Sequence, residues 1–150
     1  MSGTYVNLLY HIIFSTKHRE PMILEAFKDE LHAYLGGVLR DERGRLLCIG
    51  GTADHVHLLA LISPATAVSE ILRWLKGNSS TWINKARKLP SRFSWQEGYG
   101  AFTVSESVKP DVMDYISKQK IHHQKQNFQD EFRAFLRKHH VEYDERYIWK

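Results

Sequence analysis

The sequence predicts an α+β fold, in which an antiparallel sheet carries helices on one face and a further helix follows towards the C-terminus. The first observation is the order of strand-like and helix-like stretches, β-α-β-β-α-β followed by two helices. The second is length, because 150 residues suit one domain that buries its own core. The third is composition: 43% hydrophobic and 25% charged residues are typical of a soluble globular protein and exclude a disordered chain, a collagen-like fibre or a coiled coil. We therefore expect residues 1–150 to form a single domain.

The first half of the chain supplies three of the expected strands and one helix. Residues 5–15 alternate apolar side chains between two faces, and both faces should be at least partly covered. Pro21 opens a helical pattern that should end before Asp41. Residues 46–49 and 55–62 are typical of two antiparallel strands joined by a short loop with glycines.

The second half supplies the fourth strand and the remaining helices. A helical pattern runs from Pro64 to residue 83, and the run Gly77-Asn78-Ser79-Ser80 within it indicates a kink or a break. A loop at 89–98 leads to a strand at 99–104. Pro110 then opens a helix, and a last helix carries the apolar residues Phe128, Phe132, Phe135 and Leu136.

This order of elements folds most simply as a ferredoxin-like or RRM-like antiparallel sheet, followed by the two further helices. The tail from residue 141 to residue 150 holds Tyr143, Tyr147 and Trp149, which is too aromatic for a free tail. We expect it to pack on its own domain or on a partner subunit.

The single cysteine, Cys48, excludes an internal disulfide and a zinc site built on several thiolates. It lies in an apolar run, where a small buried hydrophobe is the expected role. No stretch is long and apolar enough to cross a membrane, so we expect a cytoplasmic protein with no membrane partner. The net charge of +4 permits a nucleic-acid partner without demanding one.

The run Asp54-His55-Val56-His57-Leu58-Leu59 carries the most chemical information. Alternate side chains of a strand share a face, so His55 and His57 project side by side and can share one metal ion. Two histidines packed in a sheet explain the same spacing. A histidine-triad hydrolase would need a third histidine where Leu59 stands. Asp54 points to the other face of a regular strand, and we expect it to hold the turn.

A polar helix face near residue 115 is the second chemical feature. Tyr115 and Gln119 are four residues apart and therefore one helical turn apart on one face, which continues through His122, His123 and Gln126. The stretch from Ile116 to Gln129 has no acidic residue but holds Lys118, Lys120 and Lys125, which favours a phosphate ligand. A solvated helix surface with an incidental tyrosine is the alternative.

A basic segment between residues 68 and 96 points in the same direction. Its cations are interleaved with aromatic residues, a mixture that suits single-stranded nucleic acid. The alternative places the tryptophans in the core and the charges in solvent, and for Trp82 we favour the core. The candidate DNA-binding residues are Arg73, Lys76, Lys85, Arg87, Lys118 and Lys120.

Together these stretches resemble the single-tyrosine HUH transposases of the insertion-sequence 200/605 type. The resemblance covers nearly the whole chain, and the order and spacing of its motifs are highly specific. It is carried by Tyr10-His11-Ile12-Ile13-Phe14 with Thr16-Lys17-His18-Arg19, by residues 54–59, by Leu75-Lys76-Gly77-Asn78-Ser79-Ser80, by residues 98–105, and by Tyr115-Ile116-Ser117-Lys118-Gln119 with His122-His123.

The resemblance implies a role for each matching residue. His55 and His57 match the HUH pair that binds Mg²⁺ or Mn²⁺, Gln119 matches the third metal ligand, and Tyr115 matches the nucleophile. Family members are homodimers that act on single-stranded DNA with hairpin ends. They cleave and rejoin element ends through a 5′-phosphotyrosine intermediate, so the protein would associate with the nucleoid when acting. The site can be completed within one subunit or by the partner's tyrosine helix.

Three other functions remain open on the sequence. A domesticated relative acting on repetitive palindromic DNA would keep the same chemistry. A non-enzymatic single-stranded nucleic-acid-binding module needs no nucleophile, so the complete set of His55, His57, Tyr115 and Gln119 argues against it. A metal-dependent nuclease that uses water would keep the histidine pair but would not need Tyr115.

Overall fold

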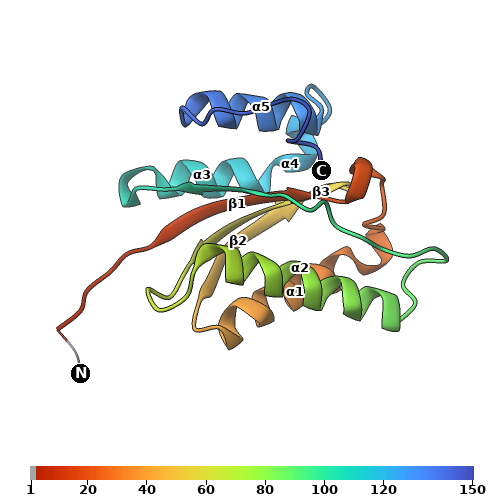
Figure 1. The fold of residues 1–150 in the computed structure, drawn as a ribbon, viewed down its shortest axis with the longest axis horizontal. Helices are drawn as coiled ribbons and strands as arrows, with labels where there is room; N and C mark the ends of the chain where they lie inside the picture. The colour runs from red at the N-terminus through yellow and green to blue at the C-terminus, as the bar shows by residue number, and fades with distance from the viewer. Residues whose placement is uncertain (1–2) are drawn as a thin grey trace.

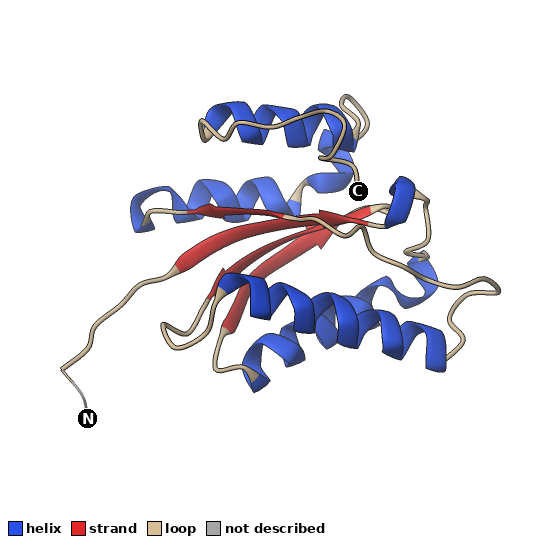
Figure 2. Ribbon diagram, viewed as in Figure 1, coloured by secondary structure: helices blue, strands red, loops and turns tan. Residues whose placement is uncertain are grey.

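The computed structural model describes residues 3–150 and contains one four-stranded antiparallel sheet in the order β2-β3-β1-β4 (Figure 2). The strands are β1 (Leu9–Ser15), β2 (Arg45–Gly51), β3 (His55–Leu61) and β4 (Gly100–Thr103). The sheet and its helices confirm the predicted α+β class. The first strand is shorter than the sequence indicated, because residues 5–8 precede the ladder.

Helices α1 (Glu25–Asp41) and α2 (Val68–Lys85) cover one face of the sheet, as the sequence predicts (Figure 1). The ring of Tyr34 in α1 stacks on the ring of Trp82 in α2, with the centroids 4.9 Å apart, so Trp82 belongs to this layer. The sheet contributes alternate residues to the same layer. The main core there includes Ile12, Phe14, Val56, Leu58, Leu31, Leu35, Ile71, Leu72 and Leu75, each less than 2% exposed.

Helix α2 runs without a break through Gly77–Ser80, so the break that the sequence allowed is not present. Ser79 resolves the apparent conflict, because its hydroxyl donates to the Leu75 carbonyl inside the same helix at 2.6 Å. The Trp95 indole in turn donates to the Ser79 hydroxyl at 2.9 Å. Ser79, which belongs to the run that suggested a helix break, is therefore buried and links α2 to the loop before β4.

The opposite face of the sheet carries α3 (Lys109–Ser117), α4 (Gln119–His122) and α5 (Phe128–Lys138). Helix α3 approaches β2 so closely that a Cβ on Gly50 would lie 2.1 Å from the Ile116 carbonyl oxygen. Only glycine fits such an approach. The apolar contacts on this face are smaller, with Ile116 beside Leu9 and Leu59, and Ile13 beside the phenylalanines of α5.

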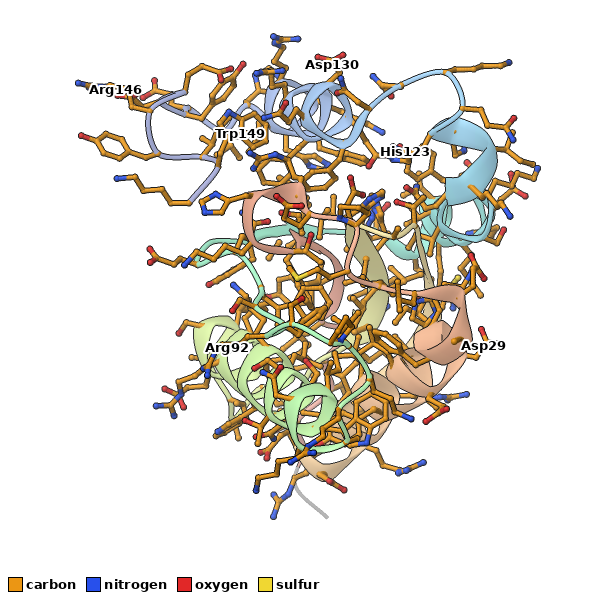
Figure 3. All side chains as sticks on the ribbon, turned by 90° about the vertical axis from the view of Figure 1, so that its right-hand side faces the viewer. Asp29, Arg92, His123, Asp130, Arg146 and Trp149 are labelled. Carbon is orange, nitrogen blue, oxygen red and sulfur yellow. The ribbon has the colours of Figure 1, made fainter. Side chains whose placement is uncertain are left out.

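The C-terminal tail packs on its own domain, which decides between the two placements that the sequence left open. Trp149 packs against Phe132 of α5, and Arg133 binds Glu145 through two hydrogen bonds of 2.6 and 3.1 Å. The Lys150 carbonyl accepts a hydrogen bond of 2.9 Å from the amide of Gly98. Figure 3 shows Trp149 and His123 on one side of the sheet and Arg92 on the other. Within the described residues, no helix has the length and hydropathy that a membrane crossing requires.

Candidate active site

The His-x-His pair lies on β3 and is completely buried. His55 and His57 project to the face covered by α3, α4 and α5, while Val56 and Leu58 enter the main core. The two imidazole rings lie with their centroids 5.1 Å apart. The alternation expected from the sequence thus holds in the folded strand, and it aims both rings at the C-terminal helices.

The Nε2 atoms of both histidines face oxygen atoms from those helices. Nε2 of His55 lies 3.0 Å from Oε1 of Gln119, and Nε2 of His57 lies 2.8 Å from Oε1 of Glu131. One ligand atom from each of His55, His57, His123 and Glu131 lies within 4.8 Å of the other three. Imidazole nitrogens and carboxylate and amide oxygens are the donors that divalent cations use in proteins.

Two observations indicate that these nitrogen and oxygen atoms suit a cation as ligands. Nε2 of His123 is buried and has no hydrogen-bond partner, although it lies 3.1 Å from Oε1 of Glu131. His55 faces an acceptor on both sides, the Gln119 amide oxygen and the Asp54 carboxylate, so a neutral ring can satisfy only one of them. A cation placed between Nε2 of His55 and Oε1 of Gln119 would satisfy both.

The far nitrogen of each ring is held by a second residue. Nδ1 of His55 lies 2.7 Å from Oδ1 of Asp54, which also accepts a hydrogen bond of 2.9 Å from the Thr52 hydroxyl. Burial alone would raise the pKa of Asp54, but the hydrogen bonds from His55 and Thr52 bring that pKa below its usual value. Asp54 does hold the turn, since its carbonyl accepts from the Thr16 amide, but it also orients His55.

His57 is held in a defined tautomer. Its Nδ1 lies 2.8 Å from Nε2 of His11 on the neighbouring strand β1. Because the Glu131 carboxylate can only accept, Nε2 of a neutral His57 carries the hydrogen and Nδ1 accepts from His11. Burial lowers the pKa of His57 to about 4, despite the opposing effect of Glu131. A metal ion held at Nε2 would replace that hydrogen, and the neutral ring would then carry its hydrogen on Nδ1 and donate it to Nε2 of His11.

Tyr115 reaches the same carboxylate from α3. Its hydroxyl donates to Oε2 of Glu131, and its ring lies 6.0 Å from the His57 ring and stacks on His122 at 4.4 Å. Burial, followed by the Glu131 carboxylate, raises the pKa of Tyr115 above its usual value. The phenol therefore stays protonated at neutral pH, and any attack by its oxygen needs a proton acceptor.

Glu131 lies at the centre of the site and is 2% exposed. Burial alone would raise its pKa, but the surrounding His123, His57 and Tyr115 groups hold that pKa below its usual range. The carboxylate therefore remains ionised. Sequence reasoning missed Glu131 because it lies in the last helix, whose phenylalanines indicated core packing and not a polar site. One pattern in the sequence could have indicated it. Glu131 follows Phe128 by three residues and precedes Phe135 by four, so this acidic side chain lies on the apolar face of α5.

Gln119 differs from the expectation in one respect. The sequence places it on the same helix as Tyr115, but α3 ends at Ser117 and Lys118 has non-helical dihedrals of −106° and 22°. Gln119 then begins α4 and is 1% exposed. The turn still brings the two residues together, with 3.5 Å between Nε2 of Gln119 and the Tyr115 carbonyl oxygen.

Comparison with known proteins identifies the family. The sequence model described as "Transposase IS200 like" matches residues 4–119. The chain belongs to this family. The IS200-like match contains His55, His57, Tyr115 and Gln119, which confirms the resemblance seen in the sequence.

Curated relatives of this IS200-like transposase agree with that assignment. The "Transposase for insertion sequence element IS200" of Salmonella typhimurium is 32% identical in an alignment of 128 residues that covers 79% of this chain and 81% of the relative. The ISDra2 transposase TnpA of Deinococcus radiodurans is 28% identical over 122 residues, covering 78% of this chain and 87% of the relative.

Two solved structures share the fold. One is a candidate transposase of Deinococcus radiodurans R1, with a TM-score of 0.64 and 27% identity, covering 77% of this chain and 93% of that one. The other is a REP-associated tyrosine transposase bound to a REP hairpin, with a TM-score of 0.61 and 16% identity, covering 82% and 73%. At that identity the second structure supports the fold alone.

The family match ends at Gln119, before two of the buried donors of the site. His123 follows α4, and Glu131 belongs to α5. In this chain, the segment after residue 119 therefore places a carboxylate, Glu131, and an imidazole, His123, beside the pair of His55 and His57.

The candidate DNA-binding residues fall into two groups. Lys118 and Lys120 lie beside the site, and Lys118 pairs with Asp114 at 2.9 Å. The other four belong to α2 or follow it. Lys76 is half-buried and donates to the Glu97 and Gly98 carbonyls at 2.8 Å each, and burial lowers its pKa to about 8. Arg73 pairs with Glu70, and Lys85 is exposed.

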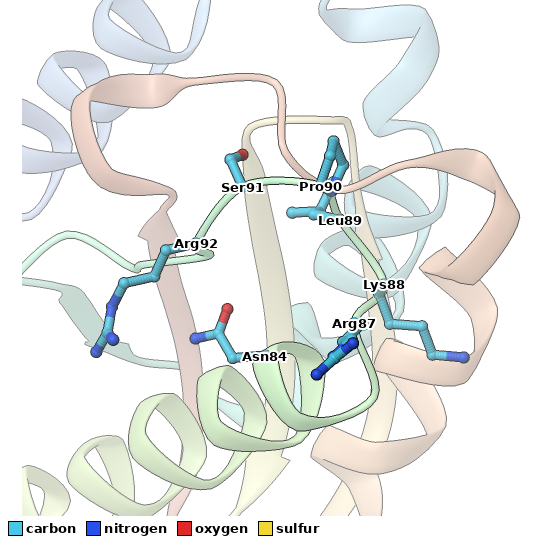
Figure 4. A pocket seen from close by; sticks show the side chains of 7 residues that line it. All are labelled: Asn84, Arg87, Lys88, Leu89, Pro90, Ser91 and Arg92. Carbon is cyan, nitrogen blue, oxygen red and sulfur yellow. The ribbon is translucent and has the colours of Figure 1, made fainter.

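Arg87 lines an open pocket of about 710 Å³ after α2 (Figure 4). Lys88 and Arg92 add two more cations, and Asn84 holds the loop through hydrogen bonds of 2.8 and 3.1 Å with the Phe93 backbone. DNA contact by these side chains stays a prediction.

Proposed function

We propose that this IS200-like transposase cleaves and rejoins single-stranded DNA, with Tyr115 as the nucleophile. One observation carries the proposal: the Tyr115 hydroxyl and Nε2 of His57 contact the two oxygens of one carboxylate, that of Glu131. The nucleophile and the candidate metal site are therefore neighbours within a single subunit, in a pocket built on one face of the sheet.

His55, His57 and Gln119 would hold a divalent cation, Mg²⁺ or Mn²⁺, and Glu131 and His123 are available as further ligands. Such an ion polarises the scissile phosphate and stabilises the charge of the transition state. Asp54 and His11 keep the two β3 imidazoles oriented for this task through their Nδ1 atoms.

Besides the divalent cation, the covalent step uses Tyr115 and Glu131 of the chain and the scissile phosphate of the DNA. The Tyr115 oxygen attacks the phosphorus, and its proton leaves along the hydrogen bond to Oε2 of Glu131. The P–O3′ bond breaks, which leaves a 5′-phosphotyrosine on Tyr115 and an O3′ alkoxide, and this oxygen takes up a proton from solvent to become the free 3′-hydroxyl. Because the phosphotyrosine conserves the energy of the broken bond, a 3′-hydroxyl can reverse the reaction without ATP.

The expected partners follow from this chemistry. One tyrosine per subunit supports one covalent cleavage at a time, so two coordinated cleavages require a homodimer. The substrate is single-stranded DNA with a hairpin, in keeping with the hairpin bound to the REP-associated structural relative. The site of action is the nucleoid in the cytoplasm. A domesticated relative that processes repetitive palindromic DNA would use the same residues.

The decisive experiment is to trap the covalent adduct. The protein is incubated with a labelled single-stranded hairpin oligonucleotide and Mn²⁺ or Mg²⁺, and the products are separated on a denaturing gel. We expect an adduct with the wild type and with Tyr99→Phe, a matched control on an exposed tyrosine, and none with Tyr115→Phe. Cleavage that persists undiminished in Tyr115→Phe would contradict the tyrosine mechanism and favour hydrolysis by water.

A further inference from the structure

A second cavity opens directly beside Tyr115. It has a volume of about 520 Å³ and lies between α3, α5 and the segment that follows β4. Tyr115 and Glu131 line it, so it is continuous with the proposed active site. Most of its remaining wall is apolar and comes from Val104, Val108, Val112, Ala134 and Phe135.

One wall of the cavity is aromatic. The Phe135 ring meets the Tyr115 ring edge-on at 5.6 Å and the His11 ring edge-on at 5.0 Å. His139 extends this wall, with its ring nearly parallel to Phe135 at a centroid distance of 6.3 Å. An apolar space with aromatic rings on one side accommodates a flat aromatic ring, and its volume lies in the range of small-ligand sites.

The charges in the cavity decide which part of a nucleotide enters it. Asp111 and Glu131 both line the wall, so a phosphate inside would meet two carboxylates. A neutral base meets no such repulsion, and Asp111, Thr103 and Gln126 offer hydrogen-bonding groups to its edge. Lys138, whose side chain is exposed to solvent, suits the phosphate of the same nucleotide.

We propose that this cavity, which we name the base pocket, takes the unstacked base of a nucleotide next to the scissile phosphate. The inference rests on the proposed function, because the scissile phosphate must approach the Tyr115 oxygen that borders the pocket. Four of the lining residues, Glu131, Ala134, Phe135 and Lys138, come from α5, beyond the part of the chain that the family model matches. The base preference would therefore be a property of the segment after residue 119.

Binding of abasic DNA tests the pocket. Tyr115→Phe keeps the ring that lines the pocket but cannot form the adduct, so affinity can be measured by fluorescence anisotropy on uncleaved oligonucleotides. A series of hairpin oligonucleotides carries one abasic site at each position in turn along the single-stranded flank. We expect removal of one base to weaken binding about 10-fold, the size of a single base–aromatic stack. Equal affinity across the whole series would overturn the proposal.

Filling the pocket supplies the second arm. Ala134→Phe fills it from α5, and Val108→Trp fills it from the opposite wall, each in the Tyr115→Phe background. In both we expect the 10-fold dependence on that base to fall below about 2-fold. Arg137→Phe, an exposed position on the same helix outside the pocket, should leave the ratio at about 10-fold. An unchanged ratio in both filled variants would contradict the assignment.

The two proposals fail separately. An adduct with wild-type protein but no dependence on any base contradicts the base pocket alone. A base dependence that disappears in the filled variants, without any adduct in the wild type, supports the pocket and contradicts the tyrosine mechanism.

Discussion

The two faces of the sheet differ in the side chains that strand β3 contributes to them. Val56 and Leu58 enter the layer of α1 and α2, where the packed side chains form one extended apolar core. His55 and His57 enter the layer of α3, α4 and α5, where a carboxylate, an amide and further imidazoles surround them. One strand of alternating residues thus builds a core on one side and a polar site on the other.

The outer layer also holds its apolar residues differently. They form two small groups, one around Ile116 and one around the phenylalanines of α5, with the histidine site adjoining them. Helix α5 and the tail are tied down by Arg133, which binds Glu145 and lies 4.9 Å from the Trp149 ring. The extended apolar core therefore lies in the layer of α1 and α2, and the proposed chemistry in the layer of α3, α4 and α5, so truncations in the two layers should differ in their main effect.

The largest expected effect is on the outer face. His57→Ala removes an imidazole that faces both Glu131 and His11, and with it one of the proposed metal ligands. We expect adduct formation to fall about 1,000-fold, since a metal ion contributes several kcal/mol to such a transition state. Calorimetric titration with Mn²⁺ should show weakened binding. Normal cleavage by His57→Ala would show that the metal assignment is wrong.

The matched substitution on the inner face is Leu58→Ala, one residue along the same strand. Leu58 is fully buried in the main core, so truncation should lower the free energy of unfolding by about 2–5 kcal/mol. Urea denaturation measures this loss. At a temperature where the variant is folded, the adduct should still form. If Leu58→Ala lost the adduct while folded, the two layers would not be separable.

A pH dependence of intermediate size follows from the buried His57. The pKa of His57 is about 4 in the folded chain and about 6.5 when unfolded. Protons therefore bind the unfolded state first as the pH falls, and stability should decrease by about 3 kcal/mol between pH 6.5 and pH 4. Urea unfolding in the presence of a chelator measures this. In His57→Gln the decrease over this window should be smaller by the same amount, and an identical slope would contradict the assignment.

The smallest effect is expected from a glycine substitution in the layer of α1 and α2. A Cβ on Gly77 of α2 would meet no atom within 4 Å, so Gly77→Ala should raise the free energy of unfolding by about 0.5–1 kcal/mol. Gly50→Ala is the contrasting variant, because it would press on the Ile116 carbonyl and shift α3. We expect it to lower both stability and adduct formation. A stabilising Gly50→Ala would contradict the close approach of α3 to β2.

Much of the site could be predicted because its residues lie in regular local patterns. The spacing of His55 and His57 fixes their common face in any strand, and four residues bring Gln119 one turn from Tyr115 even though the helix is interrupted at Lys118. Two features have a tertiary origin. Gly77–Ser80 continues the helix, where Ser79 bonds to Leu75 and Trp95, and Asp54 holds the turn as expected but also orients His55.

The sequence by itself determined the α+β order of elements, the family, and the placement of His55 and His57 on a strand and of Tyr115 on a helix. Only the tertiary structure decided that C-terminal helices cover the histidine face and bring Glu131 and His123 within ligand distance of one another. The physical reason is the distance along the sequence over which each effect acts. Periodicity places a side chain on its own strand or helix, whereas the meeting of β3 with α5, more than seventy residues later, depends on packing such as the close approach of α3 at Gly50.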